Sequence, residues 1–354
     1  MKYPVRTLTA LLAGVLLVAA CGDDETDPVA SDEGATITLQ THDSFNISES
    51  VLDEFTAETG ITVELLPSGD AGAMVNQAIL TKGNPQGDVL FGIDNTFLSR
   101  ALDEGLFVAY ESPALDGVSE EVQLDDEHRV TPIDTGDVCL NYDKAGLAAA
   151  DLDAPASLDD LLDPAFGGTL VVENPATSSP GLSFLLATVA EYGEDGWEDY
   201  WESLTANGVE VAAGWEEAYY GSFSGSAGSE GDRPLVVSYA SSPPAEVIFA
   251  EEPLDDAPTG VVVESCYRQI EFAGILAGTD HQAEAQQLID FMLSDTFQSD
   301  IPLNMFVYPV TDVDLPEEFV RYGATASDPY LVDADVVAEN RDDWIERWTE
   351  IVLR

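Results

Sequence analysis

Basic residues are the scarcest feature of this chain. Only 12 lysines and arginines stand against 68 aspartates and glutamates, for a formal net charge of −56. Such a surface repels the phosphates of nucleic acids and anionic lipid headgroups, so both are excluded as binding partners. The acids are spread along the whole chain, and we interpret most of them as an acidic, halophilic surface whose mutual repulsion strong salt screens. The rest could attract a cationic ligand.

Histidine and cysteine are also rare, with three of each. This leaves little material for a zinc site built on those ligands. No G-x-S-x-G motif occurs, and His42, Asp43 and Ser44 are consecutive, whereas the members of a catalytic triad converge from separate elements. His42 is most simply a surface histidine. These absences argue against a hydrolase and against a zinc site built on histidine.

Long apolar runs are missing after the first 20 residues, so no later segment is expected to span a bilayer. Residues 8–20 are mostly apolar and follow Lys2 and Arg6. A charged start, a short apolar stretch and small residues before the cut are typical of a secretory signal, here residues 1–20. The cysteine that follows, Cys21, resembles the lipidated cysteine of bacterial lipoproteins, which becomes the mature N-terminus. An ordinary signal peptide with a chance cysteine is the alternative.

The segment after the signal has the composition of a tether. Residues 21–35 are rich in Asp, Glu, Ser and Pro and have no apolar periodicity. The chain beyond them is long enough for two lobes with proper cores. We therefore predict a globular body held outside the cell by a lipid anchor.

Strand-like and helical segments alternate along that body. Strands are predicted at residues 36–40, 61–66, 88–91, 131–142, 168–173, 209–212, 235–239 and 261–270. Helices are predicted at 47–59, 71–81, 98–104, 157–162, 181–192, 283–293, 296–301 and 334–351. This order predicts α/β architecture with parallel strands covered by helices. Ligands of such sheets bind beyond the carboxyl ends of the strands, which directs attention to the loops there.

Three of those loops carry polar side chains just before a helix. They contain Asp43 and Ser44, then Asp94, then Ser178 and Ser179. Each residue alone is explained by helix capping. The third loop, however, holds more hydroxyls than one cap needs, and a helix N-terminus with free N–H groups suits an oxyanion. This excess favours binding.

A fourth loop carries aromatic residues beside acids. Trp215 follows a predicted strand and precedes Glu216 and Glu217, and Tyr239 ends another strand. A cation held against such rings gains on the order of 0.5–2 kcal/mol. An isolated tryptophan is more often a core residue, but the acids next to Trp215 weaken that interpretation. Trp215 and Tyr239 could therefore stack on a flat ligand.

The motifs in these loops resemble one known family. Read in order, they are DSF, GIDN, NYDK, NPATSSPGL, GWEEAY, SYASSP and VYPV. The series is similar to the thiamine-binding proteins of bacterial ABC importers, and it covers nearly all of the chain from Thr36 onward. The resemblance implies an α/β, two-lobed type II periplasmic-binding-protein fold that closes on its ligand around a hinge of crossing strands. It also implies that the protein is not an enzyme, performs no chemistry on the ligand and needs no metal or cofactor.

Carried over by position, the resemblance implies a set of ligand-binding residues. They are Asp43, Ser44, Asp94, Ser178, Ser179, Trp215, Tyr219, Tyr239 and Phe306. The ligand would be thiamine or its phosphate esters. Some positions depart from the family pattern: Phe306 replaces a tryptophan, His42 replaces a tyrosine, and residues 46–49 contain no aromatic. These departures affect the exact ligand more than the fold.

The same topology implies how the chain is divided. Residues 36–135 and 267–354 would form lobe one with the C-terminal helices, and 136–266 would form lobe two. Cys139 and Cys266 would lie on adjacent hinge strands, within reach of a disulfide. The partners implied are a membrane permease and its ATPase. The protein would work as a monomer, anchored to the outer face of the cytoplasmic membrane.

A ferric-ion-binding protein of the same fold is the alternative function. Tyr219 and Tyr220 are adjacent, and paired tyrosines with a histidine and a carboxylate suit a hard trivalent ion. The match to GWEEAY and SYASSP favours the organic cation over iron.

Overall fold

The computed structural model describes residues 34–354, which form one compact unit. The predicted signal segment, Cys21 and nearly all of the tether lie outside the described residues. Within 34–354, no helix has both the length and the apolar character needed to cross a membrane.

One mixed β-sheet runs through the described part of the chain. Its strands are β1 (Thr36–Thr41), β2 (Thr62–Pro67), β3 (Val89–Asp94), β4 (Phe107–Val108), β5 (Thr131–Asp143), β6 (Leu170–Glu173), β7 (Glu210–Ala212), β8 (Leu235–Tyr239), β9 (Thr259–Leu276) and β10 (Tyr308–Pro309). The main order is β2-β1-β3-β9-β5-β8-β6-β7. β1, β2 and β3 pair in parallel, as do β7, β6 and β8, so each end of the sheet has the predicted parallel core.

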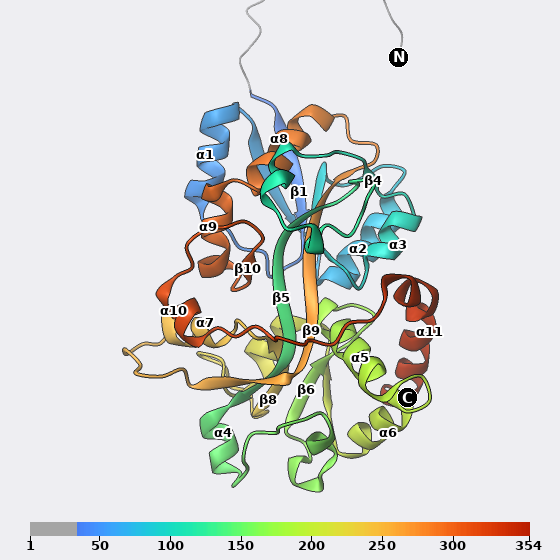
Figure 1. The fold of residues 1–354 in the computed structure, drawn as a ribbon, viewed down its shortest axis with the longest axis vertical. Helices are drawn as coiled ribbons and strands as arrows, with labels where there is room; N and C mark the ends of the chain where they lie inside the picture. The colour runs from blue at the N-terminus through green and yellow to red at the C-terminus, as the bar shows by residue number, and fades with distance from the viewer. Residues whose placement is uncertain (1–33) are drawn as a thin grey trace, which may run out of the picture. The chain divides into compact units, whose positions relative to one another are not determined.

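Two long antiparallel strands join those ends. β5 and β9 pair from Thr131 opposite Ala273 to Asp143 opposite Thr259, and Figure 1 shows them running side by side between the upper and lower groups of strands. β9 extends six residues beyond its predicted end at Ile270, because it also pairs with β3 and β4. Cys139 on β5 and Cys266 on β9 form a disulfide, with Cα atoms 4.1 Å apart.

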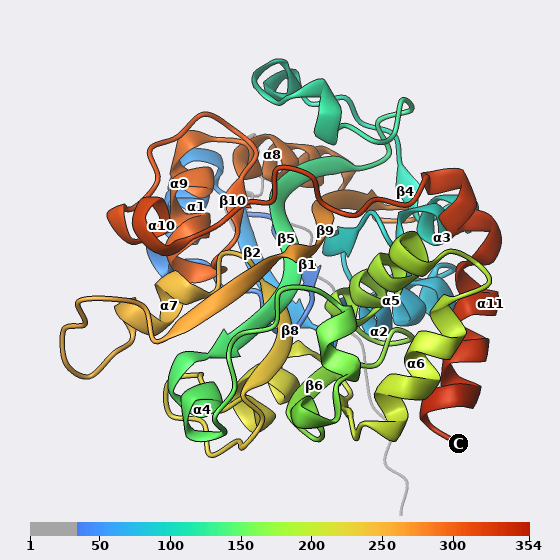
Figure 2. The same ribbon diagram turned by 60° about the horizontal axis from the view of Figure 1, so that its bottom comes forward.

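Helices cover both groups of strands (Figure 2). They are α1 (Glu49–Thr59), α2 (Ala71–Thr81), α3 (Leu98–Asp103), α4 (Lys144–Ala149), α5 (Ser179–Tyr192), α6 (Trp197–Ala206), α7 (Pro243–Ile248), α8 (Gln282–Met292), α9 (Asp295–Asn304), α10 (Glu317–Tyr322) and α11 (Ala334–Val352). Short 3₁₀ segments are η1 (Pro113–Gly117), η2 (Glu120–Val122), η3 (Asp159–Leu162) and η4 (Pro164–Phe166), and η5 (Glu217–Ser222) is a π-helix.

The helix predicted at residues 157–162 is only the 3₁₀ turn η3. Pro164 follows it closely, and the residue before a proline is disfavoured in the α conformation. Asp163 accordingly adopts an extended conformation and ends the turn. The helix predicted at 181–192 begins two residues earlier, at Ser179, with Ser178 as its cap and Pro180 in its first turn.

The C-terminal helix α11 connects parts of the fold that are distant in sequence. It packs on α6, where the Trp348 ring meets Trp201 edge-on with centroids 5.4 Å apart. It also reaches α3, where Arg100 pairs with Asp342 at 3.5 Å. The sequence-based division placed this helix with lobe one, yet α6 lies in the segment assigned to lobe two. α11 therefore contacts elements of both segments.

Nearly every lysine and arginine of residues 34–354 is already in an ion pair, which leaves most acids without a positive neighbour. We expect NaCl to raise the melting temperature, because about 1 M salt shortens the Debye length to about 3 Å from about 10 Å at 0.1 M. Thermal melts across that range test this. Sucrose, which does not screen charge, is the control, and a melting temperature that salt leaves unchanged would contradict the halophilic interpretation.

Candidate functional site

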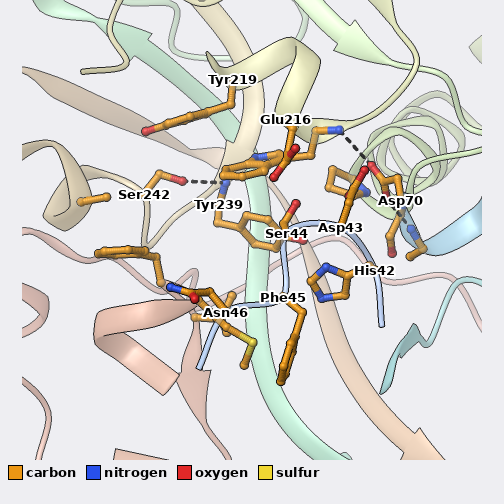
Figure 3. Close-up of a pocket in the computed structure, with 18 of the residues that line it drawn as sticks. His42, Asp43, Ser44, Phe45, Asn46, Asp70, Glu216, Tyr219, Tyr239 and Ser242 are labelled. Carbon is orange, nitrogen blue, oxygen red and sulfur yellow. Dashed lines mark hydrogen bonds between the residues drawn. The ribbon is translucent and has the colours of Figure 1, made fainter. Parts of the chain in front are cut away.

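A cavity of about 250 Å³ lies where loops from both ends of the sheet meet. Its walls come from the loop after β1, the segment before α2, the first turn of α5, residues 215–220, the end of β8 with α7, one residue of β9, and residues 304–307. Figure 3 shows the rings of Tyr219 and Tyr239 on one side, with Asp43, Asp70 and His42 gathered on the other. This volume is slightly below the range of about 300–1,000 Å³ that is usual for small-molecule sites.

Seven of the nine predicted ligand-binding residues line this cavity. They are Asp43, Ser44, Ser179, Trp215, Tyr219, Tyr239 and Phe306. Asp94 and Ser178 do not line it. The sequence pattern therefore located most of the wall.

The aromatic wall is a cluster of rings rather than isolated side chains. Trp215 stacks on Tyr219 with centroids 4.9 Å apart and meets Tyr220 edge-on at 5.4 Å. Its indole Nε1–H donates to the Ser238 hydroxyl at 2.9 Å, which fixes the ring plane. The other four tryptophans lie in the core formed by α6 and α11. Among the tryptophans, Trp215 alone faces the cavity.

Tyr239 is held in place by the strand beneath it. A Cβ atom on Gly136 of β5 would lie 2.8 Å from the Tyr239 ring, closer than side-chain packing allows. Glycine at this position therefore leaves room for the Tyr239 ring beside β5. The structure thus explains a residue to which the motif analysis assigned no role.

Phe306 has a backbone conformation that is rare for its residue type. Its φ angle is +56°, in the left-handed region that a bulky side chain seldom adopts. The Phe306 ring stacks with Phe319 and meets Phe249 edge-on, with 5.4 Å between the centroids of Phe306 and Phe249. The Phe306 carbonyl accepts a 2.6 Å hydrogen bond from the Ser241 hydroxyl. These contacts hold the strained turn beside the cavity.

His42 is not the surface histidine that the sequence predicted. Its ring lies 5.6 Å from Phe91 and 6.5 Å from Phe45, and its Nε2 is 3.9 Å from a carboxylate oxygen of Glu271. Burial lowers the pKa of His42 to about 4, so the imidazole is neutral at pH 7. Phe91 and Glu271 come from other strands, which is why sequence context alone missed this packing.

Asp70 is a second cavity residue that the sequence analysis missed. Its carboxylate accepts backbone N–H groups from Ala71 at 2.6 Å, Trp215 at 2.8 Å and Ser179 at 3.4 Å. It therefore ties together the starts of α2 and α5 and the Trp215 loop. Burial raises the pKa of Asp70 to about 6, against the lowering effect of the hydrogen bonds from Trp215 and Ala71. The signal in the sequence that could have identified Asp70 is its position between a predicted strand and a predicted helix.

Asp94 and Ser178 support the wall from behind. Asp94 is fully buried and accepts hydrogen bonds from the backbone and hydroxyl of Thr96 and the backbone of Phe97, so it caps the turn into α3. It also accepts a hydrogen bond from the Ser179 hydroxyl, which lines the cavity. Ser178 caps α5. Both residues orient groups that face the cavity.

The charged side chains that line the cavity are all acidic. Asp43, Asp70, Glu216 and Glu271 line the cavity, and no lysine or arginine of residues 34–354 lies in its wall. His42 is neutral, so it does not offset these acids. Burial, with contributions from neighbouring acids, also raises the pKa of Glu216 and Glu271. An arrangement of aromatic rings and carboxylates without basic residues attracts a flat cation.

The two adjacent tyrosines, Tyr219 and Tyr220, are poorly suited to bind iron. The Tyr219 hydroxyl donates a 2.8 Å hydrogen bond to Glu246, and burial raises the pKa of Tyr219 well above its ordinary value. Iron-binding tyrosines must lose that proton. Within residues 34–354, no cluster of three or more His, Cys, Asp or Glu side chains is placed to hold a metal ion.

Glu173, at the end of β6, is a buried acid whose two carboxyl oxygens have no hydrogen-bond partner among the described residues. Burial and the nearby Asp70 raise its pKa well above the ordinary value of 4.5. The folded state therefore keeps a proton that the unfolded state loses, and stability falls as pH rises above about 5.

The variant Glu173→Gln mimics the protonated acid and should lose this pH dependence. We compare the free energy of unfolding of this variant with that of wild type. The difference should grow in favour of the variant by about 1.4 kcal/mol for each pH unit above about pH 5, up to the pKa of Glu173 in the folded protein. Urea unfolding at several pH values measures this difference. Glu64→Gln, at an exposed position on β2, is the control. A difference that is constant with pH would show that Glu173 is ionised in the fold.

Comparisons with known proteins agree with this geometry. The chain is 32% identical over 322 residues to the thiamine-binding periplasmic protein of Escherichia coli K12, covering 90% of this chain and 94% of that protein. A solved periplasmic thiamin binding protein superposes with a TM-score of 0.81 at 28% identity, covering 91% of this chain and 97% of that one. A ferric binding protein from Campylobacter jejuni has a TM-score of 0.69 at 16% identity, covering 89% and 99%, which shows a shared fold alone.

These similarities confirm the predicted α/β fold of the type II periplasmic binding proteins. The profile of the bacterial extracellular solute-binding proteins matches residues 84–326, a segment that includes the aromatic wall, both crossing strands and Phe306. The chain belongs to the bacterial extracellular solute-binding protein family.

Proposed function

We propose that this protein is the solute receptor of an ABC importer and that it binds thiamine in the cavity described above. The observation that carries the proposal is the lining itself, in which stacked aromatic rings and four acidic side chains occur with no lysine or arginine from residues 34–354. Its relatives are named as thiamine-binding periplasmic proteins, which supports the same ligand.

The three parts of thiamine match three parts of the cavity. The cationic thiazolium and the flat aminopyrimidine suit the exposed faces of Trp215 and Tyr239 and the carboxylates around them. The hydroxyethyl arm suits the end near Ser179 and Asp70, where hydroxyl and carboxylate groups can pair with an alcohol. Two different interactions, stacking and charge, would thus act on one ligand.

Phosphate esters of thiamine would extend into that same end. At pH 7 a phosphate there meets the Asp70 carboxylate, and the two negative charges repel each other. Because the pKa of Asp70 is about 6, lower pH converts it into a donor. The affinity of thiamine monophosphate relative to thiamine should therefore rise as pH falls.

The remaining parts of the proposal concern the setting of the protein. A lipidated Cys21 would hold it on the outer face of the cytoplasmic membrane, next to a permease and its ATPase. Metabolic labelling of Cys21 with a fatty acid tests the anchor. No enzymatic step belongs to this role, in line with relatives named as binding proteins.

Titration calorimetry with thiamine, its mono- and diphosphate, and ferric citrate tests the ligand assignment. Saturable one-to-one binding of thiamine, with no heat from ferric citrate, is the expected result. A red-brown protein with a tyrosinate-to-iron charge-transfer band would favour the ferric-ion alternative at Tyr219 and Tyr220. Absence of binding to thiamine and both esters would contradict the proposal.

A further inference from the structure

Two buried acids face each other across the crossing strands. Asp134 on β5 and Glu271 on β9 are direct partners in the strand pairing, and their exposed fractions are only 1% and 7%. Burial raises the pKa of both acids, and the neighbouring Asp134 raises the pKa of Glu271 further. Two buried carboxyl groups on paired strand positions repel each other when both are ionised, which favours a state in which one of them holds a proton.

The surroundings of the pair contain no positive charge to replace that proton. The titratable groups that face Glu271 are His42 beside β1, Asp70 before α2, Asp94 at the end of β3, Asp134 on β5 and Tyr239 on β8. Among the described residues, neither Asp134 nor Glu271 forms an ion pair with a lysine or arginine. His42 is neutral because burial lowers its pKa to about 4. With no positive charge beside them in the described part of the chain, the two carboxyl groups cannot both be ionised without strong mutual repulsion.

Glu271 links the pair to the cavity. Its side chain lines the cavity, whereas Asp134 lies behind it and leaves one oxygen, Oδ2, without a hydrogen-bond partner among residues 34–354. A cation that enters the cavity therefore brings the first positive charge to this group of acids. Its attraction favours the ionised form of Glu271 over the protonated form.

We propose that the Asp134–Glu271 pair holds one proton in the free receptor and releases it when a permanently cationic ligand binds. The O–H bond of Glu271 breaks, the proton passes through the cavity to solvent or buffer, and two carboxylates remain beside the ligand's positive charge. Ligand binding thus replaces a proton on the receptor with the bound cation. This inference rests on the proposed function, because it requires a cationic ligand in this cavity.

Calorimetry in two buffers of different ionisation enthalpy measures the exchange. At pH 7, thiamine binding should release up to about one proton per receptor, and affinity should increase as pH rises. An uncharged analogue, in which a thiophene ring replaces the thiazolium, should bind more weakly and release none. Equal binding enthalpies in both buffers, or proton uptake, would overturn the inference.

Two variants separate the pair from other acids. In Glu271→Gln the proton release should vanish, and thiamine affinity at pH 8 should fall about tenfold or more, while the affinity of the uncharged analogue is retained. In Asp134→Asn the release should shrink, because Glu271 loses the neighbour that favours its protonation. Glu64→Gln, an exposed acid on β2, is the matched control and should behave as wild type. Full proton release in Glu271→Gln would overturn the inference.

The same data distinguish the inference from the proposed function. If neither thiamine nor the uncharged analogue binds to wild type or to the Glu64→Gln control, the proposed function fails. If thiamine binds without proton exchange, only the inference about Asp134 and Glu271 fails. Thermal melts of each variant identify any that does not fold.

Discussion

Replacing Trp215 with alanine is expected to weaken thiamine binding by about 30- to 150-fold, or about 2–3 kcal/mol. The indole stacks on Tyr219 and is fixed by its hydrogen bond to Ser238, so it presents a rigid surface to the cavity. Alanine removes the face that would cover the ligand and the ring's attraction for a cation. Calorimetry with thiamine measures the loss.

Trp215→Phe is the matched variant for this experiment. It keeps an aromatic face but lacks the Nε1–H group that donates to Ser238, so we expect an intermediate loss of affinity. Trp348→Phe, in the core between α6 and α11, should lower stability but not affinity. Affinity unchanged by Trp215→Ala would mean that the ligand does not contact this wall, and the aromatic assignment would be wrong.

Removing the disulfide between Cys139 and Cys266 is expected to cost about 3–5 kcal/mol of unfolding free energy. The bridge joins residues 127 positions apart, so it restricts a large loop of the unfolded chain. Urea unfolding of the double variant Cys139→Ala/Cys266→Ala measures the loss. The bridge also lies between β5 and β9, the strands that join the two ends of the sheet, and we predict that it restrains motion between them.

Reductant provides the control for the double variant. Wild type unfolded in dithiothreitol should lose most of the same stability, whereas the double variant should not respond to it. Agreement between the two measurements would separate the cross-link from the change of side chains. Two free thiols in the secreted, unreduced protein, detected by mass analysis, would contradict the bridge itself.

Much of the fold could be predicted because the relevant signals are local. The cap at Ser178 and the proline at position 180 mark the start of α5, and the left-handed Gly60 marks the end of α1. β9 was predicted too short, because its last six residues are stabilised by pairing with β3 and β4 rather than by their own pattern.

The candidate site, like the fold, could be predicted from the sequence only in part. Trp215 and Tyr239 stand in motifs that are specific enough to be recognised without coordinates, and both line the cavity. Asp94 was grouped with them, yet its side chain turns back to accept hydrogen bonds from Thr96 in the turn before α3, and it contacts the cavity-lining Ser179. A motif identifies a loop, but the direction of each side chain depends on hydrogen bonds formed after folding.

By itself, the sequence determined the α/β class, the solute-binding family and the aromatic and acidic character of the site, because these depend on periodicity, turn chemistry and motifs read along the chain. The tertiary structure alone decided that His42, Asp70 and Glu271 share one cavity, and that Asp134 lies behind Glu271. The physical reason is strand register: residues 137 positions apart become neighbours only when β5 and β9 pair, and that pairing turns two ordinary acids into one buried group.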